Sequence, residues 1–296
     1  MTVPTAASTA SGPSATAPAS TVGRAGRNVP IAIAVGTVLG GAVLGSLFTY
    51  RPLFVALVAA SVAYGCYELA SVLRTAAGRH VPLPPLAVGA AVTYTIAYQR
   101  GTQALAVGVL LTAVALMGWN LADHPARDDE GFRVAKDLAA GLWVLCYLVL
   151  LAGFSILLAA PTDGARRTAC FMATVVCSDV GGFVAGVLFG KHPLAPRVSP
   201  KKSWEGLAGS VVACLLGASL LLIPLLHVDW WQALIFGLAM ALVATAGDLA
   251  ESLVKRDLGV KDMGRLLPGH GGIMDRLDSM LLTAPVAYLL LTAFTS

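Results

Sequence analysis

Nine long apolar segments follow one another along this 296-residue chain, and each is long enough to cross a bilayer as a helix. A spanning helix needs about 20 predominantly apolar residues, and an isolated segment in lipid satisfies its own backbone hydrogen bonds only as a helix. The segments are 30–49, 52–72, 82–99, 102–121, 138–160, 168–190, 206–227, 230–250 and 277–295. We therefore predict an all-α, polytopic integral membrane protein with about nine transmembrane helices.

The composition supports a bilayer as the solvent. Only 12% of the residues are charged and 57% are hydrophobic, whereas soluble domains have about 25% charged residues. A formal net charge of +4 is too small and too dispersed to indicate a nucleic-acid partner. The five cysteines lie in apolar runs without paired spacing, which argues against a zinc site or a disulfide framework.

Three regions differ in character. Residues 1–28 are rich in Ala, Ser, Thr and Pro and are predicted to form a disordered cytoplasmic tail. Residues 29–160 hold the N-terminal transmembrane helices. Residues 161–296 form a C-terminal transmembrane region that carries the chemistry, with polar loops at 191–205 and 252–276. Arg24 and Arg27 directly precede the first apolar segment, which favours a retained span over a cleaved signal peptide.

The basic residues predict the orientation, because cytoplasmic loops of membrane proteins are enriched in Lys and Arg. With nine spans, alternate loops place sixteen of the twenty Lys and Arg residues on one side. The other side receives only Arg51, Arg100, Arg166 and Arg167. The N-terminus and the loops 191–205 and 252–276 are therefore predicted to be cytoplasmic, in a multi-pass protein of the plasma membrane.

Charged residues concentrate between 252 and 278, which hold nine of the 36 in the chain. Asp248, Ser252 and Lys255 have helical spacing and would share one helix face. An acid near a membrane segment is costly unless it is paired or bound to a metal. Asp275 and Asp278 would likewise share a face, and carboxylates of this kind suit Mg²⁺.

Two further segments complete the polar set. The turn 268–272 contains three glycines, whose backbone N–H groups can approach an anion closely. Ser199 and Ser203 flank Lys201 and Lys202 at what we predict to be a tight proline turn, an arrangement suited to binding phosphate. Asp179 lies within an apolar segment. Each feature alone has a structural explanation, such as a helix cap, a flexible turn or an interfacial anchor; their combination favours phosphoryl or nucleotidyl transfer.

Residues 252–278 resemble the signature of the phosphatidate cytidylyltransferase (CDP-diacylglycerol synthase) family, from Ser252-Leu-Val-Lys-Arg256 through Pro268-Gly-His-Gly-Gly272 to Asp275-Arg-Leu-Asp278. The segments around Asp179 and 199–206 are also similar to family segments, and the resemblance is strong over about 175–280. One departure is Gly182-Phe183, where the family often has Ala-Tyr.

The resemblance implies an all-helical membrane enzyme, a homodimer, that uses CTP, phosphatidic acid and Mg²⁺, with room for a second cation. Metal ligands would be Asp275 first, then Asp248 and Asp278. The phosphate contacts would come from Lys255, Arg256, Lys261 and Arg276, assisted by Lys201, Lys202 and Ser203. The catalytic set would be Asp275, Asp248, Lys255 and Arg276. Substrate-binding residues would also include Ser199, Ser252, Asp179 and, at the nucleotide, His270, Gly271 and Gly272.

Two alternatives remain open at this point. A CTP-dependent polyprenol kinase would act on a lipid alcohol instead of a lipid phosphate. A secondary transporter for an anionic solute could also use intramembrane acids, although the chain shows no clear internal repeat and such a transporter would not release pyrophosphate from CTP.

Overall fold

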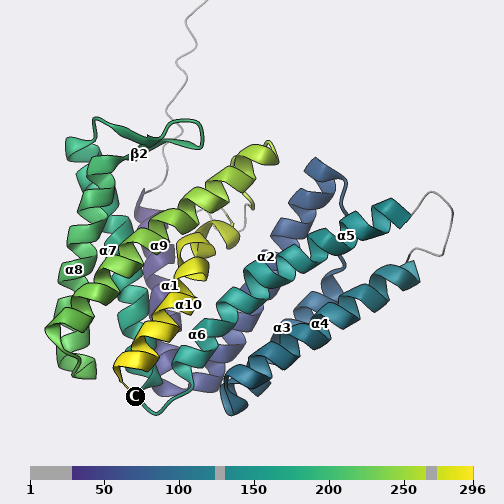
Figure 1. Ribbon diagram of the computed structural model, residues 1–296, viewed down its shortest axis with the longest axis horizontal. Helices are drawn as coiled ribbons and strands as arrows, with labels where there is room; N and C mark the ends of the chain where they lie inside the picture. Colours follow the sequence, from purple (N-terminus) through teal and green to yellow (C-terminus); the bar gives the residue numbers. More distant parts are fainter. Residues whose placement is uncertain (1–28, 124–130, 265–271, 296) are drawn as a thin grey trace, which may run out of the picture.

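The computed structural model describes residues 29–123, 131–264 and 272–295. Within these ranges the chain forms a helical bundle with one short hairpin (Figure 1). The helices are α1 (Val29–Thr49), α2 (Arg51–Ala77), α3 (Leu83–Arg100), α4 (Thr102–Asp123), α5 (Gly131–Val144), the π-helical η1 (Leu145–Leu150), α6 (Leu151–Ala159), α7 (Gly164–Phe189), α8 (Trp204–Leu226), α9 (Trp230–Asp257) and α10 (Met274–Phe294). Because α5, η1 and α6 are continuous in sequence, they form one long helix with a π-helical middle.

Each predicted apolar segment coincides with a helix, so the all-α fold is confirmed. In the described part of the chain, seven helices are long and apolar enough to span a membrane: α2, α4, the α5–α6 helix, α7, α8, α9 and α10. Helix α1 contributes a shorter apolar stretch, Val38–Thr49, and α3 does not reach the same measure of length and apolarity. These helices identify the protein as a polytopic membrane protein. The total of nine spans stays a prediction.

Helices α7 and α8 pack with their backbones in close approach, because small residues face one another along the contact. A Cβ added at Gly209 would lie 2.2 Å from the Ala185 Cβ, and one added at Gly181 would lie 2.4 Å from the Ala213 Cβ. Small residues are the usual means of bringing helices together in lipid, where the hydrophobic effect does not drive association. The glycine-rich stretch after Asp179 therefore serves helix packing.

The loops sort into two ends of the bundle. At one end, Arg79 after α2 forms an ion pair with Asp137 of α5 at 3.8 Å. At the other end, Arg51 donates to the carbonyl oxygen of Pro161 at 2.5 Å, and Arg166 donates to that of Leu225 at 3.2 Å. In each of these contacts, the two segments that meet are ones that the prediction of nine alternating spans places on the same side of the membrane.

The described residues form two large apolar cores and a small third one around Ala97, Leu105 and Leu157. The first packs α2, α3 and the α5–α6 helix, and it includes Met263 and Met274 from the segments on either side of residues 265–271. The second packs α6, α7, α8, α9 and α10, around Phe171 and Phe236. The N-terminal core therefore holds two residues of the charged C-terminal segment.

The segment after α7 differs from the prediction. Residues Pro193–Ala195 (β1) and Ser199–Ser203 (β2) pair as an antiparallel hairpin, at the upper end of the view in Figure 1. The predicted tight turn at Pro200 was wrong: Pro200 lies within β2, and the chain reverses before it, between β1 and β2. The hairpin's pairing extends Lys201 and Lys202 along a strand.

Candidate active site

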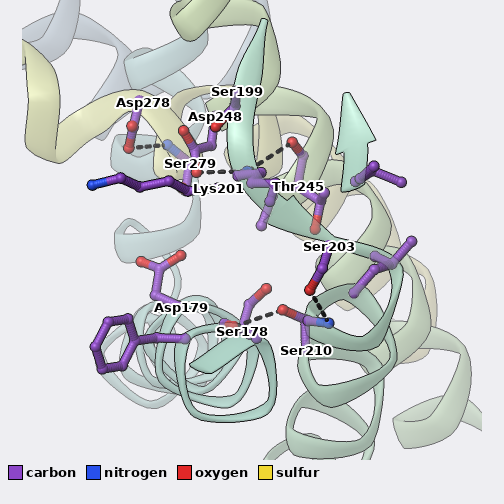
Figure 2. Close-up of a pocket in the computed structure, with 18 of the residues that line it drawn as sticks. Ser178, Asp179, Ser199, Lys201, Ser203, Ser210, Thr245, Asp248, Asp278 and Ser279 are labelled. Atoms are coloured by element: carbon purple, nitrogen blue, oxygen red, sulfur yellow. Dashed lines mark hydrogen bonds and ion pairs between the residues drawn. The ribbon is translucent and has the colours of Figure 1, made fainter. Parts of the chain in front are cut away.

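A cavity of about 460 Å³ lies between the hairpin and helices α7, α8, α9 and α10. Its walls combine four carboxylates, three basic side chains and several hydroxyl groups, shown in part in Figure 2. The charged residues that line it are Asp179, Lys201, Lys202, Asp248, Asp275, Arg276 and Asp278. This grouping unites residues of four elements, α7, β2, α9 and α10, that lie up to about a hundred positions apart in the sequence.

The close approach of α9 and α10 places two of the carboxylates together. A Cβ added at Gly247 would lie 2.9 Å from the Asp278 carbonyl oxygen. Asp248 follows this glycine directly, so its side chain and that of Asp278 both reach the cavity (Figure 2). Asp179 approaches the same space from α7 on the opposite side.

Asp248 contacts Ser252, which shares its predicted helix face, and a lysine of the hairpin, whereas Lys255 of that face pairs with other acids. Its Oδ2 lies 2.6 Å from the Lys202 Nζ of the hairpin, and its Oδ1 accepts a longer hydrogen bond from Ser252 at 3.5 Å. The Asp248 side chain is 37% exposed. A carboxylate that remains accessible while paired with a lysine is suited to contact a charged ligand.

Asp275 has a more enclosed environment. Its Oδ1 lies 2.6 Å from the Lys255 Nζ, and its Oδ2 accepts the backbone N–H groups of Gly272 at 2.9 Å and Met263 at 3.2 Å. Lys255 also pairs with Glu251, at 3.1 Å, and the Glu251 side chain is 1% exposed. Asp275 therefore ties together the two described ends of the segment that contains residues 265–271.

The hairpin closes one side of the cavity and is held there by polar contacts. Ser203 ends β2 and accepts the Gly206 N–H at 3.1 Å, which caps α8. Arg256 of α9 donates to the Val198 carbonyl oxygen at 3.3 Å. Lys202 donates to the Thr245 carbonyl oxygen at 3.4 Å. These bonds fix the strand that carries the two lysines against α9.

Most of the predicted site residues meet here. Nine of them line the cavity: Asp179, Ser199, Lys201, Lys202, Ser203, Asp248, Asp275, Arg276 and Asp278. Ser252, Lys255 and Gly272 contact its carboxylates, and Arg256 contacts the hairpin. Lys261 is exposed and does not line the cavity. His270 and Gly271 lie outside the described residues.

Sequence reasoning missed several polar residues. Ser178, Ser210, Thr245 and Ser279 line the cavity, and Ser210 donates to the Ser178 carbonyl oxygen at 2.8 Å. Single hydroxyls in apolar helices carry no distinctive pattern, because they usually bond their own backbone. Glu68, a carboxylate within the apolar α2, lies outside this lining, but an acid in such a segment is itself a signal of a function.

The donor chemistry fits Mg²⁺, which binds through one or two carboxylates together with substrate phosphates. In the described ranges, no three His, Cys, Asp or Glu side chains gather as a ready-made metal site. Asp248 and Asp278 nevertheless offer carboxylate oxygens to the cavity that Lys202 and Arg276 also line. The residues present therefore fit a cation that binds together with its substrate.

Basic side chains and carboxylates around one cavity are the combination that phosphoryl and nucleotidyl transfer uses, and here the cavity lies in a helical membrane protein. The family model described as "Cytidylyltransferase family" matches residues 30–294. The chain belongs to this family.

Curated relatives match over between about half and nearly the whole of the chain. A phosphatidate cytidylyltransferase of Mycobacterium leprae (strain TN) is 43% identical over 279 residues, which cover 91% of this chain and 89% of the relative. One of Mycobacterium bovis (strain ATCC BAA-935 / AF2122/97) is 38% identical over 282 residues, 93% of this chain and 92% of the relative. One of Helicobacter pylori (strain 26695, ATCC 700392) is 46% identical over 143 residues, 48% of this chain and 53% of the relative.

Proposed function

We propose that this chain is a phosphatidate cytidylyltransferase, which transfers CMP from CTP to phosphatidic acid and releases pyrophosphate. The observation that carries the proposal is a cavity in which lysines and an arginine line the same space as carboxylates. The names of the relatives that match over most of the chain support the substrates. The product would be CDP-diacylglycerol, an intermediate for phospholipid synthesis.

In the proposed reaction, an oxygen of the phosphatidic acid phosphate forms a bond to the α-phosphorus of CTP. The bond from that phosphorus to the oxygen bridging to the β-phosphate breaks, and pyrophosphate leaves with the electron pair. The attacking phosphate is already an anion near neutral pH, so no strong general base is needed. The protein then contributes mainly by positioning the substrates and by neutralising their charge.

The basic side chains would bind the phosphates of the two substrates. Lys201 and Lys202 extend from β2 and Arg276 extends from the start of α10, so the cations reach the cavity from different elements. Bringing two anionic phosphates together in one cavity requires such cations, because the substrates repel each other. Lys202 is held between Asp248 and the Thr245 carbonyl oxygen, which gives it a defined position before substrate binds.

Mg²⁺ belongs to the proposal as the cofactor. Asp248 and Asp278 would hold it, with Asp275 alongside, and a second cation could share these carboxylates. When bound, the cation neutralises charge that develops on the phosphate oxygens. Asp248 would also orient Lys202 through their ion pair, and Asp275 would hold Lys255 in the same way.

Lipid access is supported by apolar residues at the border of the cavity. Phe183 of α7 lines the cavity and is 71% exposed, and Val187 of the same helix is 67% exposed. Such side chains on a membrane helix face lipid, so the acyl chains of phosphatidic acid could stay in the bilayer while its headgroup enters the cavity.

The cellular setting is likewise proposed. The distribution of Lys and Arg supports a cytoplasmic N-terminus and cytoplasmic loops at 191–205 and 252–276, in the plasma membrane, where CTP would reach the cavity from the cytoplasm. A homodimer is inferred from the family resemblance alone. Measuring the mass of the purified protein in detergent, with the bound detergent subtracted, would decide between monomer and dimer.

The function is tested by pyrophosphate release from CTP by the purified protein with Mg²⁺. We expect release that requires phosphatidic acid and yields one CDP-lipid per pyrophosphate. A polyprenol in place of phosphatidic acid should give none. Phosphorylation of the polyprenol would instead indicate a lipid kinase, and the absence of any CTP turnover would point to transport.

A further inference from the structure

Glu68 is a buried carboxylate in the middle of α2, a helix of the N-terminal half. The residue is 3% exposed and is followed by the buried Leu69 and Ala70. Burying a carboxylate is costly unless hydrogen bonds compensate for the lost hydration. Its partners therefore indicate why an acid occupies this position.

The main partner of Glu68 lies 206 positions away, at the start of α10. Glu68 Oε2 accepts the Met274 backbone N–H at 2.9 Å. Helix α10 has no side-chain cap from its own N-cap residue, Ile273. The first N–H groups of a helix need external acceptors, and a negative charge at this end is favourable. Glu68 thus caps α10 from another helix.

Two glycines make room for this carboxylate. A Cβ added at Gly264 would lie 1.8 Å from Glu68 Oε1, and one added at Gly272 would lie 2.6 Å from Glu68 Oε2. The three nearest atoms to each added Cβ all belong to Glu68. The Glu68 side chain occupies the space beside both glycines, so a side chain at either position would overlap it.

The same backbone holds Asp275 of the candidate active site. Gly272 and Met263 donate their N–H groups to Asp275, and Met263 and Met274 are buried in the N-terminal core. Glu68 and Asp275 thus accept hydrogen bonds from neighbouring backbone N–H groups, those of Met274 and Gly272. A shift of the Glu68 carboxylate would move the start of α10, and Asp275 with it.

We propose that Glu68 is a positioning residue for the active site, supplied by the N-terminal half to fix the start of α10 and hence Asp275. This inference rests on the proposed function, since it assigns Asp275 a place in cytidylyl transfer. Glu68 bonds the Met274 backbone, and neither residue lines the cavity, so the effect of Glu68 on the reaction is indirect.

The first test compares Glu68→Ala and Glu68→Gln with the matched control Asp137→Asn. Asp137 is also a buried carboxylate of the N-terminal half, but it pairs with Arg79. We expect Glu68→Ala to lower kcat by about 10–100-fold and to raise the Mg²⁺ concentration for half-maximal rate. Glu68→Gln keeps the shape and one acceptor, and we expect a loss of about 3–10-fold, in line with its weaker interaction with the helix end. Asp137→Asn should leave the Mg²⁺ dependence unchanged.

The second test measures coupling with Gly264 through the thermal midpoint, Tm, which needs no activity. Gly264→Ala should lower Tm by about 2–10 °C in the parent protein, because the new methyl group overlaps Glu68. In the Glu68→Ala background the same change should have little effect. Equal Tm losses in both backgrounds would show that the Glu68 side chain does not occupy the space beside Gly264.

The outcomes separate the inference from the proposed function. If the parent protein makes no CDP-lipid, the function fails, while the Tm coupling still decides whether Glu68 fills the space beside Gly264. If the parent protein is active and both Glu68 variants retain its kcat and Mg²⁺ dependence, the positioning role is overturned. If Glu68→Ala does not fold, Glu68→Gln decides through its Mg²⁺ dependence.

Discussion

The two halves of the bundle differ in what they contribute to the candidate active site. Every described residue that lines the cavity lies between 178 and 279, in α7–α10 and the hairpin. Helices α1–α6 supply none of this lining, but they enclose Met263 and Met274 in their core and cap α10 with Glu68. The chemistry is thus concentrated in the C-terminal half, and the N-terminal half sets the position of its most charged segment.

This division explains why a charged cavity can exist in so apolar a protein. In the C-terminal half, the acids pair with nearby lysines, as in Lys202–Asp248 and Lys255–Asp275. In the N-terminal half, the buried Glu68 instead bonds a backbone N–H of α10. Removing charges from the C-terminal half should therefore abolish the reaction, whereas removing Glu68 from the N-terminal half should weaken it.

The largest expected effect is that of Asp248→Asn. It removes a carboxylate from the cavity and the partner of Lys202, so we expect kcat to fall by about 100-fold or more. The measurement is the rate of CDP-lipid formation with Asp137→Asn as the control, which should stay within about 2-fold of the parent protein. Similar losses in both variants would break the distinction between the halves.

A smaller loss is expected for Lys202→Ala. The lysine lies between Asp248 and the Thr245 carbonyl oxygen and faces the cavity. We expect kcat/KM for CTP or for phosphatidic acid to fall by about 10–100-fold, since a positioned charge on phosphate is lost. Lys191→Ala removes the same charge from an exposed site outside the cavity and should change either value by less than about 2-fold. Equal effects of the two changes would show that only the net charge matters.

Packing within the C-terminal half is tested by Gly209→Ala. The added methyl group would overlap Ala185 and the Gly181 backbone, so we expect α7 and α8 to separate and stability to fall by about 1–3 kcal/mol. Thermal unfolding in detergent measures this loss. Gly118→Ala in α4, where an added Cβ meets no atom within 4 Å, is the control and should not destabilise. A neutral Gly209→Ala would argue against close packing as the means of placing Asp179.

The smallest effect is expected for Tyr147→Phe in the π-helical η1. In the described part of the chain the Tyr147 hydroxyl is buried without a hydrogen-bond partner. Removing an unsatisfied polar group should raise stability by up to about 1 kcal/mol and leave kcat within about 3-fold. A loss of activity beyond 10-fold would instead give the N-terminal half a direct part in the reaction.

The sequence predicted the helices and much of the site, because both depend on local patterns. Apolar runs of sufficient length locate the helices whatever their packing. The spacing of Asp248 and Ser252 likewise predicted their shared helix face, and the hydrogen bond between them confirms it. Asp275 and Asp278 lie together at the start of α10, as their spacing implied.

Features that depend on contacts between distant segments were not predictable in this way. The hairpin is short and polar, and β2 contains a proline, so it lacks the apolar alternation that indicates a strand. The proposed role of Glu68 depends on its hydrogen bond with the Met274 backbone, 206 positions away. The glycines after Asp179 stand in the sequence, but the role of Gly181 depends on Ala213 and Gly209 of another helix.

The most direct test of the account is to follow label from CTP into chloroform-soluble lipid, using CTP labelled at the α-phosphate or at the γ-phosphate. We predict that the parent protein, with phosphatidic acid and Mg²⁺, transfers the α-label and none of the γ-label, and that Asp248→Asn transfers neither at a comparable rate. Transfer of the γ-label would contradict cytidylyl transfer and indicate a kinase. Undiminished transfer of the α-label by Asp248→Asn would show that the reaction does not take place in the cavity of the C-terminal half.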